Sequence, residues 1–437
     1  MNSIEGLSYT ECFQKVDISL LTQQLKNISE NSLFYIEKYN KLGLDIKLIT
    51  NLNTFSSLPF TDKDEIISEQ HNYPPFGRLS RNVSAHNLRR VHVTSGSTGK
   101  PIYIVLTEND LIATVEAGRR AFLCAGITPG DTIIHCLNYS LWAGGLTDHM
   151  SLEATGATVI PFGVGNSKNL IHTIVNLKPT AISCTPSYLS RLEYLLEEEF
   201  QIAPQDLGLK KAFLGGEGGL QDPDVRFRIE SIWKMSAIDA NYGMADVLSI
   251  FGSECRERNG LHFHGQGILF FELIDPINNS ILPIKSGQIG EMVLTNLRRE
   301  AQPLVRFRTR DLVKIVSTDE CLCGRKSFRF LVIGRTDDMI VVRGINVFPN
   351  AVANLLAKNP EWFSGEFEFL LDSPPPIDRP LLRVELGSRN AMNNNVLQAY
   401  LIQKCHEDLN FTPRLEFIRF GEFPRTEGKT RRVRKTF

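Results

Sequence analysis

The sequence lacks a long hydrophobic run, an excess of charge of one sign and a dense set of cysteines. No stretch of about 18 consecutive apolar residues occurs, so no membrane-spanning helix is expected. Lys and Arg number 48 against 49 Asp and Glu, which gives a formal net charge of -1. A chain with this balance has no overall field that attracts nucleic acid or an anionic membrane, and we expect neither as a partner.

The few cysteines also exclude a class of fold. Eight of them are scattered over 437 residues, which is unlike a disulfide framework, and a reducing compartment would keep them as thiols or metal ligands. Residues 1–10 carry Glu5 and lack the basic start and apolar run of a signal peptide. The sequence therefore predicts a cytoplasmic protein without disulfides.

The composition that is present, 42% hydrophobic and 22% charged, is that of a folded chain with a substantial core. From residue 131 onward, apolar strands alternate with amphipathic helices, a pattern that predicts a parallel sheet covered by helices. The expected strands are 132–137, 157–161, 180–184, 211–214 and 237–241, and the expected helices are 170–177, 188–198 and 224–234.

The predicted pattern of strands and helices changes twice after residue 250. Closely spaced strands at 268–274, 291–296, 304–308 and 312–316 predict a small antiparallel sheet or distorted barrel on the same domain. Beyond Arg335, short strands at 367–371 and 381–386 and a helix at 394–407 form an α+β set. We predict an α/β fold with a large domain, residues 1–336, and a small mobile α+β domain, residues 337–437.

A loop rich in hydroxyls and glycine is the strongest local signal. Its small residues allow close backbone approach, and its hydroxyls and lysine suit a phosphate group; it consists of Thr94, Ser95, Gly96, Ser97, Thr98, Gly99 and Lys100. It is not a Walker A loop, because only two residues separate its glycines and Pro101 leads into a strand. A solvated hairpin turn explains the composition equally well.

The order of later segments resembles the core motifs of the adenylate-forming superfamily. After the loop come Asn241-Tyr242-Gly243-Met244-Ala245-Asp246, then 305–311, 333–340 and 424–429. The segments 321–325 and 343–349 are most similar to the phenylacetate–CoA ligase branch. The resemblance implies a reaction in two halves: a carboxylate attacks the α-phosphate of ATP to give an acyl-adenylate and pyrophosphate, and a thiol then captures the acyl group.

The resemblance also implies roles on the nucleotide side. The loop 94–100 would hold the β- and γ-phosphates, and Asn241, Tyr242 and Gly243 would lie at the adenine. Asp246 would bind Mg²⁺, and Asp311 would accept hydrogen bonds from the ribose. Glu217 would be the acidic residue of the nucleotide-side loop. Arg306, Arg308 and Arg310 are expected on one face of a strand, either as a basic row beside the triphosphate or as a solvated charged face.

Four further residues are implied at and beyond the domain junction. Arg335 would touch the nucleotide, and Asp337 would be the hinge about which the small domain turns. Lys429 would bridge the α-phosphate and the carboxylate, and Gly344 would border the thiol tunnel.

A stretch with two aromatics and small residues matches the acyl pocket of relatives. Tyr139, Trp142, Ala143, Gly144 and Gly216 are the candidate substrate-binding residues, and two aromatics with small neighbours suit a flat ring. Core packing explains Trp142 almost as well. His135 and His149 are expected to be hydrogen-bonded structural residues.

A metal knuckle is indicated by Cys321-Leu322-Cys323-Gly324. Cys255, followed by either His262 or His264, would complete a closed Cys₃His tetrahedron suited to structural Zn²⁺.

These observations lead to one main hypothesis and two rivals. The main hypothesis is a ligase that uses ATP and Mg²⁺ to adenylate a small carboxylic acid, aryl or arylacetic, and transfers it to coenzyme A. One rival is a stand-alone adenylation enzyme that loads an acyl-carrier protein, and the other is a nucleotide-binding sensor without turnover. The oligomeric state, a homodimer included, stays open.

Overall fold

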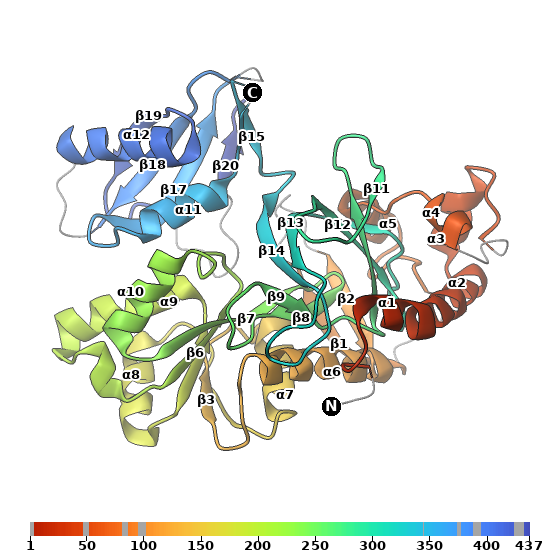
Figure 1. Ribbon diagram of the computed structural model, residues 1–437, viewed down its shortest axis with the longest axis horizontal. Coiled ribbons are helices and arrows are strands. Elements are labelled where there is room, and N and C mark those ends of the chain that lie inside the picture. Colours follow the sequence, from red (N-terminus) through yellow and green to blue (C-terminus); the bar gives the residue numbers. More distant parts are fainter. Residues whose placement is uncertain are drawn as a thin grey trace.

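The computed structural model describes residues 4–46, 52–80, 86–94, 102–343, 345–373, 377–387, 395–423 and 432–437 (Figure 1). A long sheet crosses the large part of the chain, and a separate small sheet lies near the C-terminus. Within the described ranges, no helix has both the length and the apolar character needed to span a bilayer.

The parallel half of the large sheet has the order β7-β6-β5-β3-β4. Its strands are β3 Thr132–His135, β4 Thr158–Pro161, β5 Ala181–Cys184, β6 Lys211–Gly215 and β7 Ser236–Met244. Ile133 and Phe213 pack on one face against α6 Glu108–Cys124 and α7 Ala143–Glu153, while Ile134 and Ile182 pack on the other against α8 Ser167–Leu177, α9 Pro186–Leu195 and α10 Pro223–Trp233. Because both faces are covered, the inner strands β3, β5 and β6 are buried along most of their length, and the predicted parallel sheet is confirmed.

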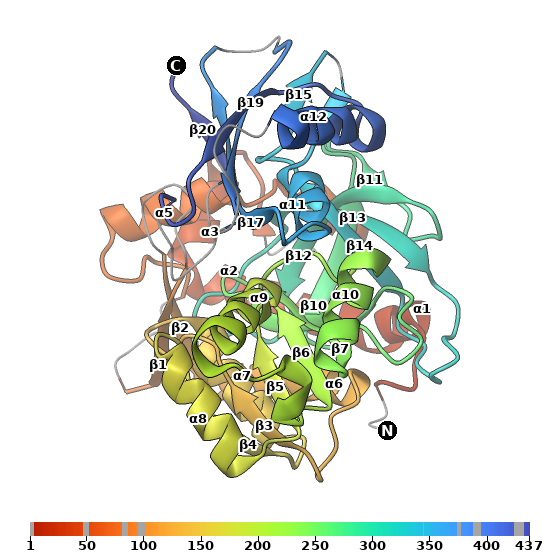
Figure 2. The ribbon, with the colours of Figure 1, turned by 90° about the vertical axis from the view of Figure 1, so that its left-hand side faces the viewer.

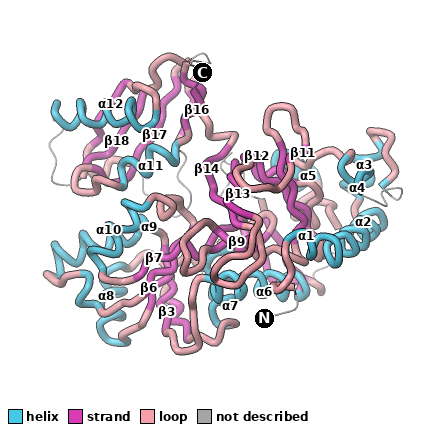
Figure 3. The backbone as a smooth tube through the Cα atoms, viewed as in Figure 1, coloured by secondary structure: helices cyan, strands magenta, loops and turns pink. Residues whose placement is uncertain are grey.

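The predicted antiparallel strands continue the same sheet. β8 pairs antiparallel with β7, and the order runs on as β8-β9-β14-β13-β12-β10-β11, so that twelve strands form one hydrogen-bonded sheet (Figure 3). These strands are β8 Leu248–Ser253, β9 Leu261–Phe263, β10 Leu269–Ile274, β11 Ile281–Leu282, β12 Ile289–Asn296, β13 Phe307–Ser317 and β14 Arg329–Arg335. Residues 307–317 form the single strand β13, which contains the strand expected at 312–316 and only the end of the one expected at 304–308.

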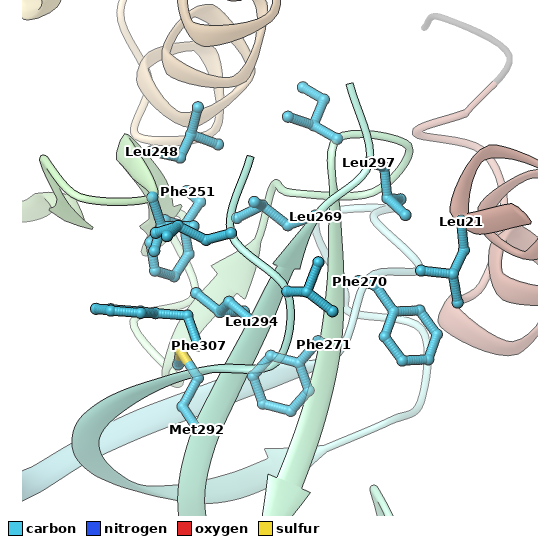
Figure 4. Packing of buried hydrophobic residues seen from close by; sticks show 14 of the residues in the cluster. Leu21, Leu248, Phe251, Leu269, Phe270, Phe271, Met292, Leu294, Leu297 and Phe307 are labelled. Atoms are coloured by element: carbon cyan, nitrogen blue, oxygen red, sulfur yellow. The ribbon is translucent and has the colours of Figure 1, made fainter. Parts of the chain in front are cut away.

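N-terminal helices cover the antiparallel half. They are α1 Tyr9–Cys12, α2 Ile18–Asn31, α3 Leu33–Asn40, α4 Leu52–Ser56 and α5 Lys63–Asn72, and the hairpin of β1 Leu88–Val93 and β2 Tyr103–Thr107 follows them. Figure 4 shows Leu21 of α2 pointing toward the side chains of β10, among them Phe270. This apolar cluster orients the strands that carry the candidate nucleotide-site residues.

The C-terminal part has its own sheet and core. Two of its strands, β17 Phe363–Leu371 and β18 Leu381–Leu386, pair antiparallel (Figure 2). Two more strands, β19 Arg414–Ile418 and β20 Val433–Lys435, pair parallel to β18 and β17, respectively. The strand order is β19-β18-β17-β20. Its helices are α11 Pro349–Ala357 and α12 Asn395–Leu409, and the hairpin of β15 Ile340–Val342 and β16 Ile345–Val347 connects it to β14. The α+β character expected for this region is observed, and its apolar cluster contains residues from Ile340 onward.

The two parts touch through α11. Lys358, the residue after this helix, forms ion pairs with Asp222 at 3.1 Å and with Asp224 at 3.2 Å at the start of α10. A Cβ at Gly334 would lie 2.6 Å from Phe348, so the glycine permits close approach of β14 to the start of α11. These contacts hold the C-terminal part over α10 and β14.

The three arginines before Asp311 correct an expectation. They form neither a basic row nor a solvated face, because each pairs with a different carboxylate: Arg306 with Glu272, Arg308 with Glu291 and Arg310 with Asp62. Arg306 precedes β13 with a φ of 47° and is 3% exposed, so the period of two does not extend to it. Its guanidinium also lies 4.2 Å from the centroid of Phe60. Arg306 is a buried structural residue.

Replacing Arg306 by Met should destabilise the large part by about 3–5 kcal/mol, because Glu272 would remain buried without its cation. The double variant Arg306→Met/Glu272→Met should regain most of that loss. Thermal melting monitored by circular dichroism measures both. Arg258→Met, which removes a half-exposed partner of Glu230, is the control and should cost less than about 1 kcal/mol. An equally small effect of Arg306→Met would contradict the structural role.

Candidate active site

A chain of hydrogen bonds joins the predicted nucleotide residues. Tyr242 at the end of β7 donates its hydroxyl to Asp311 Oδ2 at 2.6 Å, and Arg335 Nη1 donates to Asp311 Oδ1 at 3.0 Å. Arg335 also donates through Nε and Nη2 to the two oxygens of Asp337 at 2.9 and 2.7 Å. Tyr242, Asp311 and the neighbouring residues Arg335 and Asp337 therefore form one polar network that joins β7, β13 and the end of β14.

Packing fixes the tyrosine in this network. The Tyr242 ring lies 5.2 Å from Phe251 and 5.4 Å from Phe330, both in edge-on orientation. Burial, and then the negative charge of Asp311 beside it, raises the pKa of Tyr242 well above its ordinary value, so its hydroxyl keeps its proton. A Cβ at Gly243 would lie 2.0 Å from the carbonyl oxygen of Ser249, and this glycine is therefore needed for the β7–β8 pairing.

Asp246 has a neighbour that its motif does not contain. Lys63 Nζ, from α5, lies 3.2 Å from Asp246 Oδ2, and Asp246 lines a small apolar cavity with Ile66, Gln302 and Phe307. The carboxylate predicted to bind Mg²⁺ is thus already beside a cation.

Glu217 lies in the glycine-rich loop after β6. It accepts hydrogen bonds from the backbone N–H and the hydroxyl of Ser187 at 3.1 and 2.8 Å, at the N-terminus of α9. Gly216 has a φ of 77°, and a Cβ at Gly218 would lie 3.9 Å from Asn350 of α11. The loop therefore faces the C-terminal part.

The predicted acyl-binding stretch forms the entry to α7. Trp142 is the residue before the helix and is half-buried, while Ala143 begins the helix and is buried. A Cβ at Gly145 would lie 2.2 Å from the carbonyl oxygen of Asn138, whereas at Gly144 it would meet only ordinary contacts, 3.6 Å from Leu137 and 3.7 Å from Asp148. Gly145 is required by packing, and Gly144 leaves room at the helix start.

Two histidines support this stretch, as expected. Tyr139 Oη and His149 Nδ1 are 2.9 Å apart, and His149 Nε2 lies 3.1 Å from Glu153. His135 lies between the Ser183 hydroxyl and the carbonyl oxygens of Gly144 and Gly145. Burial lowers the pKa of His135 to about 4, so the ring is neutral and structural near pH 7.

Most of the phosphate loop and two further motif residues fall in gaps of the described chain. Thr94 is described: it is buried, its N–H donates to Ile102 O at 3.0 Å, and its hydroxyl accepts from Ile102 N. Ser95, Gly96, Ser97, Thr98, Gly99, Lys100, Gly344 and Lys429 lie outside the described residues.

The four predicted metal ligands come together. Cys255, His262, Cys321 and Cys323 each place one ligand atom within 4.8 Å of the others, from the β8–β9 connection, β9 and the β13–β14 connection. Cys255 Sγ lies 3.8 Å from Cys321 Sγ, and Cys323 Sγ lies 3.6 Å from His262 Nε2. His264 instead bonds Ser253 at 2.9 Å, so the geometry selects His262 of the two alternatives.

Two residues of the site are absent from the sequence hypothesis. Lys63 comes from an N-terminal helix to Asp246, and Asp148 of α7 accepts a hydrogen bond from the side-chain amide of Asn241. The spacing of motifs cannot find either, since Lys63 and Asp246 are 183 positions apart. A buried carboxylate on a helix is the structural signal for Asp148.

Comparison with known proteins identifies the family of the chain. Residues 36–295 match the AMP-binding enzyme family, and residues 344–436 match its C-terminal domain. The phenylacetate-coenzyme A ligase of Thermus thermophilus is 31% identical over 429 residues, which are 93% of this chain and 92% of that protein.

Solved structures of 2-hydroxyisobutyryl-CoA ligase, 28% identical, are also similar and add information on domain arrangement. The post-adenylation state with an acyl-AMP aligns with a TM-score of 0.86, and the thioesterification state with an acyl-AMP and CoA aligns with 0.71; each match covers 99% of this chain and 91% of that ligase. Both are structures of one enzyme in two states, and this chain superposes better on the post-adenylation state. By its sequence match, its fold and the residues gathered at the sheet junction, the chain belongs to the AMP-binding enzymes of the adenylate-forming superfamily.

Proposed function

We propose that this protein is an AMP-forming acid–thiol ligase that uses ATP to adenylate an aryl or arylacetic acid and transfers the acyl group to coenzyme A. The observation that carries the proposal is the network from Tyr242 through Asp311 and Arg335 to Asp337, because it ties the nucleotide-binding edge of the large sheet to the start of the C-terminal part. The curated ligase relative supports the choice of CoA and of a phenylacetate-like acid. A cytoplasmic location is part of the proposal.

Each residue has a task that its chemistry suits. Asp311 accepts hydrogen bonds from the ribose hydroxyls, and the hydrogen bond from the Tyr242 hydroxyl holds that carboxylate in place. Asp246 supplies an oxygen ligand for Mg²⁺, and Lys63 beside it limits repulsion between this carboxylate and the phosphates. Tyr139, Trp142 and Gly144 border the acyl group, where Gly144 leaves space for a ring.

Two half-reactions at one nucleotide site require two placements of the C-terminal part, and Asp337 is the proposed hinge. In the structure the Asp337 carboxylate is bonded to Arg335, so rotation about Asp337 exchanges these bonds for others. The two TM-scores with one related ligase support such a movement.

A panel of carboxylic acids scored for pyrophosphate release tests the function. Aryl and arylacetic acids should give release, and addition of free CoA should give the acyl-CoA thioester. Release without any thioester on free CoA, but with acylation of a carrier protein, would favour the stand-alone adenylation enzyme. ATP binding without acid-dependent release would favour the sensor.

Separate loss of the two half-reactions is expected from two variants. Lys429→Ala should slow adenylate formation by about 10²-fold or more, because the lysine neutralises charge that develops at the α-phosphate, and should spare thioester formation from supplied acyl-adenylate. Asp337→Pro should do the reverse, because a fixed φ restricts rotation at the hinge. Single-turnover assays of each half measure both. Equal impairment of both halves by Lys429→Ala would contradict the assignment.

The cysteine and histidine cluster is proposed to hold structural Zn²⁺. A tetrahedron with Zn–S bonds of about 2.3 Å and a Zn–N bond of about 2.0 Å has S–S edges of roughly 3.8 Å and S–N edges of roughly 3.5 Å. The 3.8 and 3.6 Å separations of the ligand atoms match those edges. Ser327 Oγ lies 3.2 Å from His262 Nδ1 and orients the ring so that Nε2 faces the sulfurs.

Cys321→Ser should release about one zinc ion per chain and lower the melting temperature, because a closed metal site stabilises the fold. Cys124→Ser is the matched control: Cys124 packs in the same cysteine cluster but is not one of the four ligands, and its variant should keep the metal. Elemental analysis and thermal melting give the two readouts. A metal-free wild-type protein of full stability would disprove the site.

A further inference from the structure

Asp148 is a buried acid, and only one of its two carboxyl oxygens has a hydrogen-bond partner among the described residues. It lies on α7 and is 0% exposed. Its Oδ2 accepts from the Asn241 amide, whereas its Oδ1 has no hydrogen-bond partner among the described residues. A buried polar atom without a partner is rare in a native protein and calls for an explanation.

The surroundings of Asp148 contain no counter-charge in the described parts of the chain. The nearby polar groups are neutral: Asn241 on β7, Tyr139 before α7, and His135, whose Nε2 is occupied by the carbonyl oxygens of Gly144 and Gly145. Burial raises the pKa of Asp148 well above its ordinary value. Among the described residues, one oxygen of this carboxyl group is therefore left for a further partner.

The position of Asp148 indicates what that partner is. Its Oδ2 lies 3.7 Å from the place of a Cβ on Gly144, in the proposed acyl-binding stretch, and it bonds Asn241, which directly precedes Tyr242 of the nucleotide network. An acyl-adenylate joins its acyl and nucleotide parts covalently, so it must pass between these two groups of residues. Asp148 lies where both meet.

We propose that Asp148 is a specificity residue whose carboxyl group binds a hydrogen-bond donor, an amine or a hydroxyl, on the acyl part of the substrate. The inference rests on the proposed function and narrows its substrate class to acids that carry such a donor. A purely apolar acyl group would bury the free oxygen of Asp148 without a partner and would be disfavoured. An ammonium group would also favour the ionised carboxylate.

The test compares phenylacetate with its ring-substituted amino and hydroxy derivatives, each at the ortho, meta and para positions. We expect at least one donor-bearing acid to exceed phenylacetate by about tenfold or more in kcat/KM for pyrophosphate release by the wild type. Asp148→Leu should abolish that preference and leave phenylacetate as good or better. Asp148→Asn keeps an acceptor oxygen, so it should retain part of the preference that Asp148→Leu loses.

Ser151→Ala is the control variant, because Ser151 lies on the same helix and bonds only the Thr147 carbonyl within the described residues. It should leave the order of acids unchanged. The melting temperature of Asp148→Leu should stay close to that of the wild type, since the gain from removing the unpartnered Oδ1 offsets the lost hydrogen bond to Asn241. A lower melting temperature together with an equal loss for every acid would show that Asp148 is only structural, and a wild type that prefers phenylacetate over all derivatives would overturn the inference.

Calorimetric binding of the same acids in the presence of AMP separates this inference from the proposed function. Binding of donor-bearing acids that depends on Asp148, without pyrophosphate release, would retain the specificity site and reject the ligase. Pyrophosphate release without dependence on Asp148 would retain the ligase and reject the specificity site.

Discussion

Arg335 shares one guanidinium between two carboxylates, and the geometry of the candidate site depends on this sharing. Asp311 belongs to β13 in the large sheet, whereas Asp337 follows β14 at the start of the C-terminal part. The Arg335 side chain is 32% exposed, so each pair is screened by solvent and easily exchanged. The bond between half-buried Tyr242 and buried Asp311 is less exposed to that screening. The network is thus firm on the nucleotide side and weak on the hinge side, as a domain that must turn requires.

Local sequence patterns are sufficient to predict the strands and helices whose burial depends on residues close to them in sequence. Strands such as β5 and β6 are mostly apolar because helices cover both faces, and this makes them recognisable. The same reasoning failed at Arg306. Its burial depends on Glu272 from another strand and on Phe60 from an N-terminal loop, and a positive φ before β13 breaks the alternation that the sequence suggested. A charged residue gives no local sign that its partner is distant.

The residues of the candidate site also fall into two groups, those that the sequence predicts and those that it does not. Asp311, Arg335 and the four cluster residues were predicted, because motif order or cysteine spacing marks them, and the structure brings each set together. Lys63 and Asp148 were missed, because each acquires meaning only when a remote segment arrives, Asp246 for the lysine and Asn241 for the aspartate. From the sequence alone, a polar helix residue such as Lys63 or Asp148 cannot be distinguished from a solvent-exposed one.

The Cys/His cluster and the network of Tyr242, Asp311, Arg335 and Asp337 both include residues of the β13–β14 hairpin. β13 and β14 pair with Asp311 directly opposite Arg335, and the connection between these strands carries Cys321 and Cys323. His262 lies opposite Arg329 at the start of β14, so the cluster anchors the closed end of the hairpin to β9. A one-residue slip between the strands would turn Arg335 to the other face of the sheet and separate it from Asp311. β13 and β14 contain two register shifts, which makes their pairing less constrained by the ladder alone. A fixed closed end compensates for that freedom, and this gives the cluster a function at the nucleotide site although none of its ligands reaches it.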